Sequence, residues 1–141
     1  MPSPFSKVFR WLGAKQQCLN AKAANGVGSN VDVSQFKNVG VAIITSNFTG
    51  TLQCAGSFAE WNDANLIFSN TASVLNPWGF VGMYEYDQIT AKKGTDGIAY
   101  AGDTSVKLYT VNTNEIHTLN YIVSNYVSGN VTVLVYPSNN Q

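Results

Sequence analysis

An alternation of apolar and polar residues with a period of two runs through the chain after residue 30, and it restricts the fold more than any other feature. Successive side chains of a β-strand point to opposite faces, so this alternation predicts strands. It is clearest in residues 117–123 and 131–136. Further predicted strands occupy residues 31–34, 39–44, 51–58, 81–86, 98–100 and 105–111; in residues 39–44 Val39, Val41 and Ile43 share one face and Gly40, Ala42 and Ile44 the other. Short strands between turns rich in Gly, Asn and Asp predict an all-β fold, an antiparallel β-sandwich of jelly-roll type with about eight strands.

One short phrase occurs twice. Residues 46–52 read Ser-Asn-Phe-Thr-Gly-Thr-Leu, and residues 124–131 read Ser-Asn-Tyr-Val-Ser-Gly-Asn-Val. An apolar run precedes each copy and an alternating run follows it. Glycine adopts positive φ angles at little cost, as hairpin loops require. We therefore expect two hairpin turns, with Gly50 and Gly129 at the points where the chain reverses.

Residues 1–30 differ from the rest and predict an N-terminal arm, helical or extended, ahead of a sandwich domain over residues 31–141. Residues 4–24 are the helix candidate, since apolar residues are spaced there at i, i+3, i+4 and i+7. Gly26 suits the end of a helix, and residues 25–30 resemble a flexible joint. The arm packs on its own domain or docks on a partner. We favour docking, through Phe5, Val8, Phe9, Arg10, Trp11 and Leu12.

The charge distribution supports an arm of this kind. Residues 1–30 contain four basic residues and no acidic one, whereas residues 31–141 contain four basic and eight acidic residues. A basic arm attracts acidic surfaces, but four charges are too few to indicate nucleic acid as the partner. No apolar run is long enough to span a membrane, and no signal peptide is recognisable. The charged fraction of 11% suits virion and extracellular β proteins, or simply a β-rich chain.

Residues for catalysis and metal binding are scarce. His117 is the single histidine, and no Gly-x-Ser-x-Gly elbow accompanies it. Cys18 and Cys54 match no metal-binding spacing. Cys54 lies in an alternating run and is expected in the core, and a disulfide between the two cysteines is left open. We expect no catalytic residue, no metal site, no cofactor and no enzyme activity.

Aromatic residues cluster between residues 61 and 86, together with acidic and amide side chains. Rings beside carboxylates and amides are typical of glycan-binding sites, but the same residues suit a core or a subunit interface, where Trp and Tyr are enriched. The candidate residues for a glycan site or a subunit interface are Trp61, Asp63, Trp78, Tyr84 and Tyr86.

The chain resembles a small β-sandwich module, of jelly-roll or galactose-binding-like type, that recurs in virion proteins of tailed bacteriophages. The resemblance covers about residues 31–137 and is most specific in the closing run Tyr-Val-Ser-Gly-Asn-Val-Thr-Val at 126–133. Val-Asp-Val-Ser at 31–34, Phe36-Lys37, the phrase at 47–51 and Gly56-Ser57 add to it. After Gly56-Ser57 the chain reads Phe-Ala-Glu-Trp-Asn-Asp, where the family has an Asn/Asp-Gly-x-x-Trp bend.

The resemblance implies a structural or adhesive role. We expect a virion protein, made in the host cytoplasm, that decorates or cements a capsid and docks through its arm on the major capsid protein or another virion protein. We also expect a homo-oligomer, with a trimer as our guess. The alternative is a carbohydrate-binding module of a tail fibre or host-attachment device. A peripheral membrane protein anchored by residues 4–24 is a third hypothesis.

Overall fold

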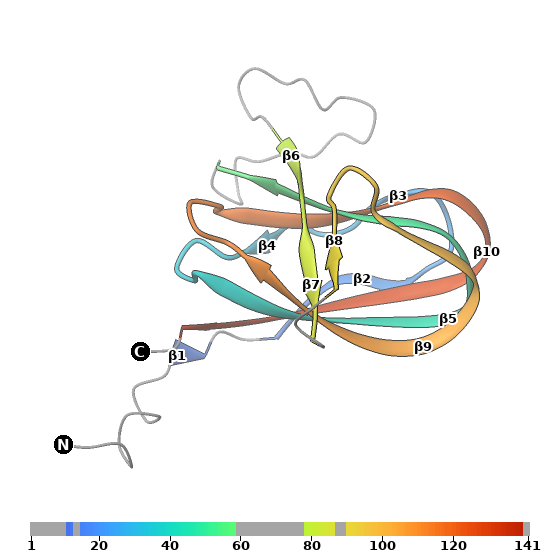
Figure 1. The fold of residues 1–141 in the computed structure, drawn as a ribbon, viewed down its shortest axis with the longest axis horizontal. Coiled ribbons are helices and arrows are strands. Elements are labelled where there is room, and N and C mark those ends of the chain that lie inside the picture. The colour runs from blue at the N-terminus through green and yellow to red at the C-terminus, as the bar shows by residue number, and fades with distance from the viewer. Residues whose placement is uncertain (1–10, 13–14, 59–77, 87–89, 140–141) are drawn as a thin grey trace, which may run out of the picture.

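The structure, a computed structural model, describes residues 11–12, 15–58, 78–86 and 90–139. These residues contain ten strands, all in one antiparallel sheet, and no helix (Figure 1). The predicted all-β class is confirmed. The strands are β1 (Trp11–Leu12), β2 (Gln16–Lys22), β3 (Gly26–Val27), β4 (Val31–Asp32), β5 (Asn38–Ser57), β6 (Trp78–Val81), β7 (Met83–Glu85), β8 (Ala91–Lys92), β9 (Ile98–Asn112) and β10 (Thr118–Asn139).

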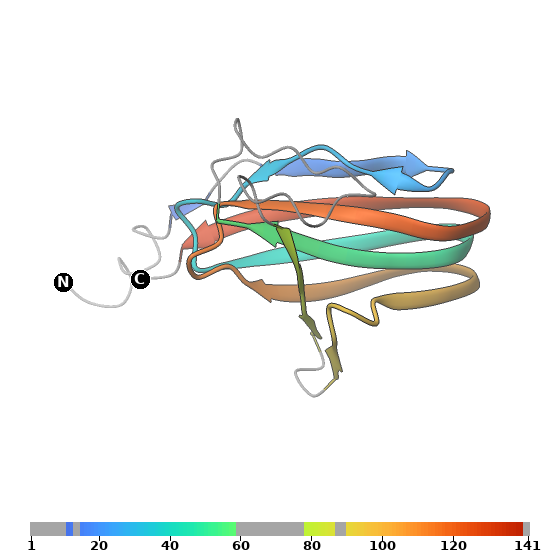
Figure 2. The same ribbon diagram turned by 90° about the horizontal axis from the view of Figure 1, so that it is seen from above.

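Three long strands build the sandwich by folding over on themselves. β5, with 20 residues, pairs with β10, with 22 residues, from Asn38↔Ser138 to Ser57↔Thr118. β9 pairs with the other edge of β5. All three strands bend together near their middles, so each contributes to two layers (Figures 1 and 2). The result is a β-sandwich closed at one end by the bend, and the jelly-roll type stays a prediction.

The short strands extend the two layers. The first layer contains the first half of β5 and the second halves of β9 and β10, with β2 beside β10, β7 beside β9 and β8 beside β7. The second layer contains the other halves, with β3 and β4 beside β10 and β6 beside β5. β6 and β7 cross from one layer to the other along the front edge (Figure 1).

The core lies between the layers and confirms the predicted strand faces. The inward side chains of β5 and β10 are buried almost completely: Val39, Val41, Ile43, Leu52 and Cys54 on β5, and Leu119, Tyr121, Val123, Val131, Val133 and Val135 on β10. Cys54 is a core residue, as the alternation predicted.

The repeated phrase marks the bend, so the prediction of two hairpin turns is wrong. The two halves of β10 do not pair with each other but continue along β5, through Ser124↔Thr51, Ser128↔Thr49 and Asn130↔Ser46. The register shifts between these pairs are β-bulges, which bend a strand and increase its twist. The two copies therefore lie side by side on neighbouring strands.

Each long strand has a residue with positive φ at this bend. These residues are Asn47 (φ 47°) on β5, Gly102 (φ 76°) on β9, and Asn125 (φ 53°) and Gly129 (φ 74°) on β10. The expectation of a positive φ angle is confirmed for Gly129 and is wrong for Gly50. Asn47 has the positive φ on β5, because asparagine tolerates the left-handed region better than most side chains.

The aromatic residue of each copy fills the inside of the bend. Phe48 is fully buried, with its ring centroid 5.4 Å from that of Tyr100 on β9 and 6.4 Å from that of Tyr126 on β10. The Tyr126 hydroxyl donates a hydrogen bond to the Gly129 carbonyl at 2.8 Å. One ring from each long strand thus packs where the sheet folds over.

The described part of residues 1–30 belongs to the sandwich, which corrects two predictions. Residues 16–22 form strand β2 on β10 rather than a helix, and Cys18 and Leu19 are buried in the core. Long-range pairing and burial override the weak local helix pattern there. Residues 25–30 are not a flexible joint, since Gly28 donates hydrogen bonds to Asn120 and Tyr121. An arm separate from the sandwich stays a prediction for residues 1–10.

Candidate functional site

The structure describes only two of the six predicted docking residues. Phe5, Val8, Phe9 and Arg10 lie outside the described residues. Trp11 and Leu12 form β1, whose backbone pairs with Asn139 and Ser138 at the end of β10. β1 therefore lies at the end of the sandwich opposite the bend (Figure 1).

The structure describes three of the five residues of the predicted aromatic site, and it does not bring all three together. Trp61 and Asp63 lie outside the described residues. Trp78 on β6 is only 8% exposed, whereas Tyr84 on β7 and Tyr86 just after it are 57% and 58% exposed. Trp78 and Tyr84 are separated by nearly extended chain, which spans roughly 20 Å over six residues. The structure brings the two tyrosines together but places Trp78 elsewhere.

Tyr84 and Tyr86 line a shallow hollow of about 340 Å³ with Glu85 and Thr110. Lys107 Nζ lies 3.5 Å from Glu85 Oε1 and forms a surface ion pair with it. Tyr86 is fixed by its backbone N–H, which donates to the Leu108 carbonyl at 3.0 Å. Two exposed rings beside a carboxylate and a hydroxyl form a small polar and aromatic site.

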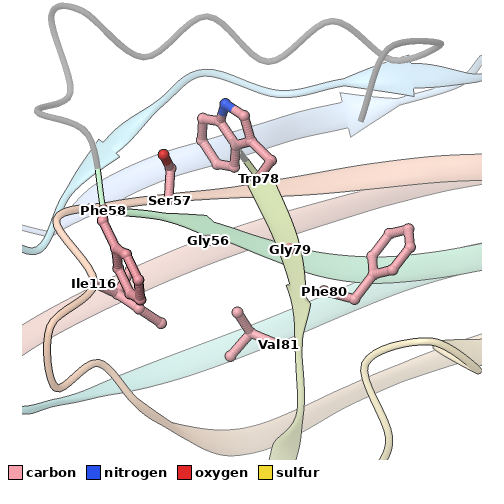
Figure 3. Close-up of a pocket in the computed structure, with 8 residues that line it drawn as sticks. All are labelled: Gly56, Ser57, Phe58, Trp78, Gly79, Phe80, Val81 and Ile116. Atoms are coloured by element: carbon pink, nitrogen blue, oxygen red, sulfur yellow. The ribbon is translucent and has the colours of Figure 1, made fainter. Parts of the chain in front are cut away.

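A second hollow, of about 400 Å³, lies where β5 and β6 meet, and sequence reasoning did not find it (Figure 3). Its floor is the cross-strand pair Gly56↔Gly79, and its lining is apolar apart from Ser57. A Cβ at Gly56 would lie 2.9 Å from Val81 Cγ2 and 3.2 Å from Ile116 Cδ1, so a side chain there would force these two side chains to shift. The remaining lining residues are Phe58, Trp78 and Phe80. The sequence signal that was available is the run Trp-Gly-Phe at 78–80, in which a glycine lies between two aromatic residues.

The two cysteines are core residues without the properties of nucleophiles. Both are free thiols, and burial raises the pKa of Cys18 and of Cys54 to about 12. Each is therefore neutral near pH 7, whereas a reactive cysteine is a thiolate. Within the described ranges no three His, Cys, Asp or Glu side chains are grouped to hold a metal ion. In the same ranges no helix is long and apolar enough to cross a membrane.

These features define a class: an antiparallel β-sandwich with shallow surface hollows, in which three long strands run through both layers. No family model and no curated protein matches the chain. Among solved structures, the crystal structure of the SPBc2 prophage-derived protein YomS is similar, with a TM-score of 0.65 over 89% of this chain and 92% of that chain. The sequence identity is 10%. The likeness shows a shared fold.

Proposed function

We propose that the chain is a structural protein of a tailed-phage particle, a decoration or cement subunit that docks on the viral shell through its first residues. The proposed role is structural rather than catalytic. Its support is the fold, which is shared over most of both chains with a protein described as prophage-derived, together with the virion-module resemblance of residues 31–137.

One observation sharpens the proposal: the sandwich begins at β1, and β2 is part of its core. Cys18 and Leu19 are 3% and 2% exposed, and residues 16–22 are paired with β10, so this segment is a fixed part of the sandwich and not a separate arm. The docking segment therefore shortens from residues 1–30 to residues 1–12. Within it Phe5, Val8 and Phe9 supply apolar surface, and Lys7 and Arg10 supply positive charge.

Deleting residues 2–10 tests the proposal, because the deletion leaves β1 and β2 intact. Each apolar side chain contributes about 1.5–3 kcal/mol on full burial, so we expect the loss of Phe5, Val8 and Phe9 to weaken binding by roughly 100-fold or more. The measurement is co-sedimentation with shells assembled from the major capsid protein encoded beside this chain. Circular dichroism and thermal unfolding should remain unchanged.

The matched control is Lys7→Glu combined with Arg10→Glu. Interface charges act mainly on association rate and salt dependence, so this variant should bind more slowly and lose most of its salt dependence. Binding of the deletion variant at full strength would rule the docking segment out. A deletion that extended through residue 25 would be uninformative, since it removes β2 from the core.

The second candidate function is carbohydrate binding on a tail fibre or host-attachment device, and the hollow between Tyr84 and Tyr86 favours it. Replacing both tyrosines by alanine should abolish binding in a glycan screen while the melting temperature stays unchanged. Tyr136→Ala is the control, because Tyr136 is also a partly exposed tyrosine but lies outside the hollow. A wild-type chain that binds no glycan would remove this candidate.

A further inference from the structure

The first half of β5 is apolar on both faces. Val39, Val41 and Ile43 point into the core, and the residues between them, Gly40, Ala42 and Ile44, point outward. A strand with one face in water alternates apolar and polar residues, whereas a near-continuous apolar run is typical of a strand covered on both faces. The pattern of β5 therefore indicates that something covers the outside of the first layer.

The neighbouring strands continue this apolar surface in register. Ile44 lies opposite Val106 on β9 and Thr132 on β10, and Ala42 lies opposite Leu108 and Leu134. A third row joins Gly40, Thr110 and Tyr136, and Tyr84 continues it on β7. We call the outward residues of these rows, with Tyr86 beside Leu108, the outer face. None of them is charged.

Much of the outer face is exposed. Val106 is 65% exposed, Leu108 52% and Tyr136 44%, in addition to Tyr84 and Tyr86. A tyrosine carries on the order of 200 Å² of surface, so the three tyrosines expose roughly 300 Å² and the two aliphatic residues bring the total to about 500 Å². That is the size of the largest apolar patches on ordinary monomers, which are often functional.

Beyond the bend the apolar outward residues of the same strands, Ala55 and Ile122, are covered by Trp78 and Val27 of this chain, whereas the outer face is exposed. The other outward positions of β5 and β10 beyond the bend are polar. On β5 the outward positions there include Thr51 and Gln53, and on β10 they include Ser124. A general apolar bias of β5 and β10 therefore does not account for the outer face.

We propose that the outer face is the contact between copies of this chain, which pack first layer to first layer. A stable interface buries about 800 Å² per partner, of which somewhat more than half is apolar. The outer face exposes about 500 Å² of largely apolar surface, which is close to the apolar area that each partner buries in such an interface. In a two-fold pair the same patch meets itself, and an uncharged patch does so without like-charge repulsion. Gly40 has no side chain and Ala42 only a methyl group, so two sheets can approach closely at the centre of the patch.

The inference goes beyond the proposed function, and its test needs no viral particle. The full-length chain should be a dimer or a larger oligomer at 50 μM in light scattering coupled to size exclusion. Leu108→Lys places a charge in the contact without entering the core, because Leu108 is half exposed. We expect it to raise the dissociation constant at least 100-fold and give monomers with an unchanged circular dichroism spectrum, and a melting temperature lowered only by the loss of association. Val106→Lys should act in the same way.

Val127→Lys is the matched control, since Val127 is 71% exposed and lies at the bend, away from the outer face. It should leave the oligomer intact. A monomeric wild-type chain at 50 μM would overturn the inference, as would an oligomer that both outer-face variants retain. Dissociation by Val127→Lys alone would place the contact at the bend and overturn the inference as well.

Discussion

Replacing Gly129 by alanine is expected to destabilise the protein by about 4 kcal/mol or more, which is exceptional for a single added methyl group. Gly129 lies at the bend of β10 with φ 74°, where alanine is strained. Its Cβ would also overlap the backbone carbonyl of Asn47 on the neighbouring strand. That atom is main chain held in the sheet, so it cannot move aside as a flexible side chain would.

Gly102→Ala separates the two causes, because Gly102 has a similar φ of 76° but nothing lies within 4 Å of an added Cβ. It should cost only the left-handed strain, about 1–2 kcal/mol. Thermal and urea unfolding of both variants measure the difference, and each kcal/mol corresponds to roughly 3 °C in melting temperature for a chain of this size. Equal losses in the two variants would show that the close approach of β5 and β10 at Gly129 is unimportant.

The bend explains why the faces of the strands could be predicted and their connection could not. A hairpin loop and a β-bulge both require residues that accept positive φ, so Ser-Asn-aromatic at 46–48 and 124–126 fits either one. A more specific signal was available in the alternation. Inward positions on β5 are odd-numbered at Val39, Val41 and Ile43 but even-numbered at Leu52 and Cys54. One inserted residue within a continuous strand produces this change of parity.

The helix prediction was wrong over residues 16–22 for a different physical reason. Their local pattern is weak, and they become a strand because β10 offers a free edge and Cys18 and Leu19 fill the core beside it. Such stabilisation comes from residues more than 100 positions away. Propensity and periodicity describe neighbours along the chain and contain little of it.

From the sequence, the aromatic site could be predicted only because one segment is rich in aromatic residues. Clustering between residues 61 and 86 indicated rings near one another in sequence, but an extended chain separates Trp78 from Tyr84. Exposure depends on which strand lies against each face, which the alternation leaves undetermined. The sequence did indicate the outer face, because residues 39–44 are apolar at every position where a strand with one solvated face would alternate. The register of β5, β9 and β10 was needed to see that the outward residues of these strands form one continuous apolar patch.

Asn120→Asp should be the other strongly destabilising change. The Asn120 side chain is 1% exposed and joins β10 to the segment after β2. Its Oδ1 accepts from the Gly28 N–H at 2.9 Å and from Cys18 Sγ at 3.3 Å. Its Nδ2 donates to the Gly28 carbonyl at 2.9 Å and to Asn30 Oδ1 at 2.8 Å. An aspartate would set an oxygen against two oxygens in a buried site, at a cost of about 3 kcal/mol or more.

The pH dependence of this loss distinguishes buried charge from simple misfit. Burial, together with the two acceptor oxygens that would face its second oxygen, should raise the pKa of the new carboxyl above its value in the unfolded chain, about 3.9. The loss relative to wild type should then grow as the pH rises from 4 to 7. Asn112→Asp is the control, because Asn112 is exposed and its Oδ1 accepts a hydrogen bond from the Asn114 N–H, which a carboxylate also accepts. Urea unfolding should show a change within about 0.5 kcal/mol for Asn112→Asp at either pH. A loss for Asn120→Asp that is small, or that shrinks as the pH rises, would mean that this amide does not hold residues 28–30 on the sheet.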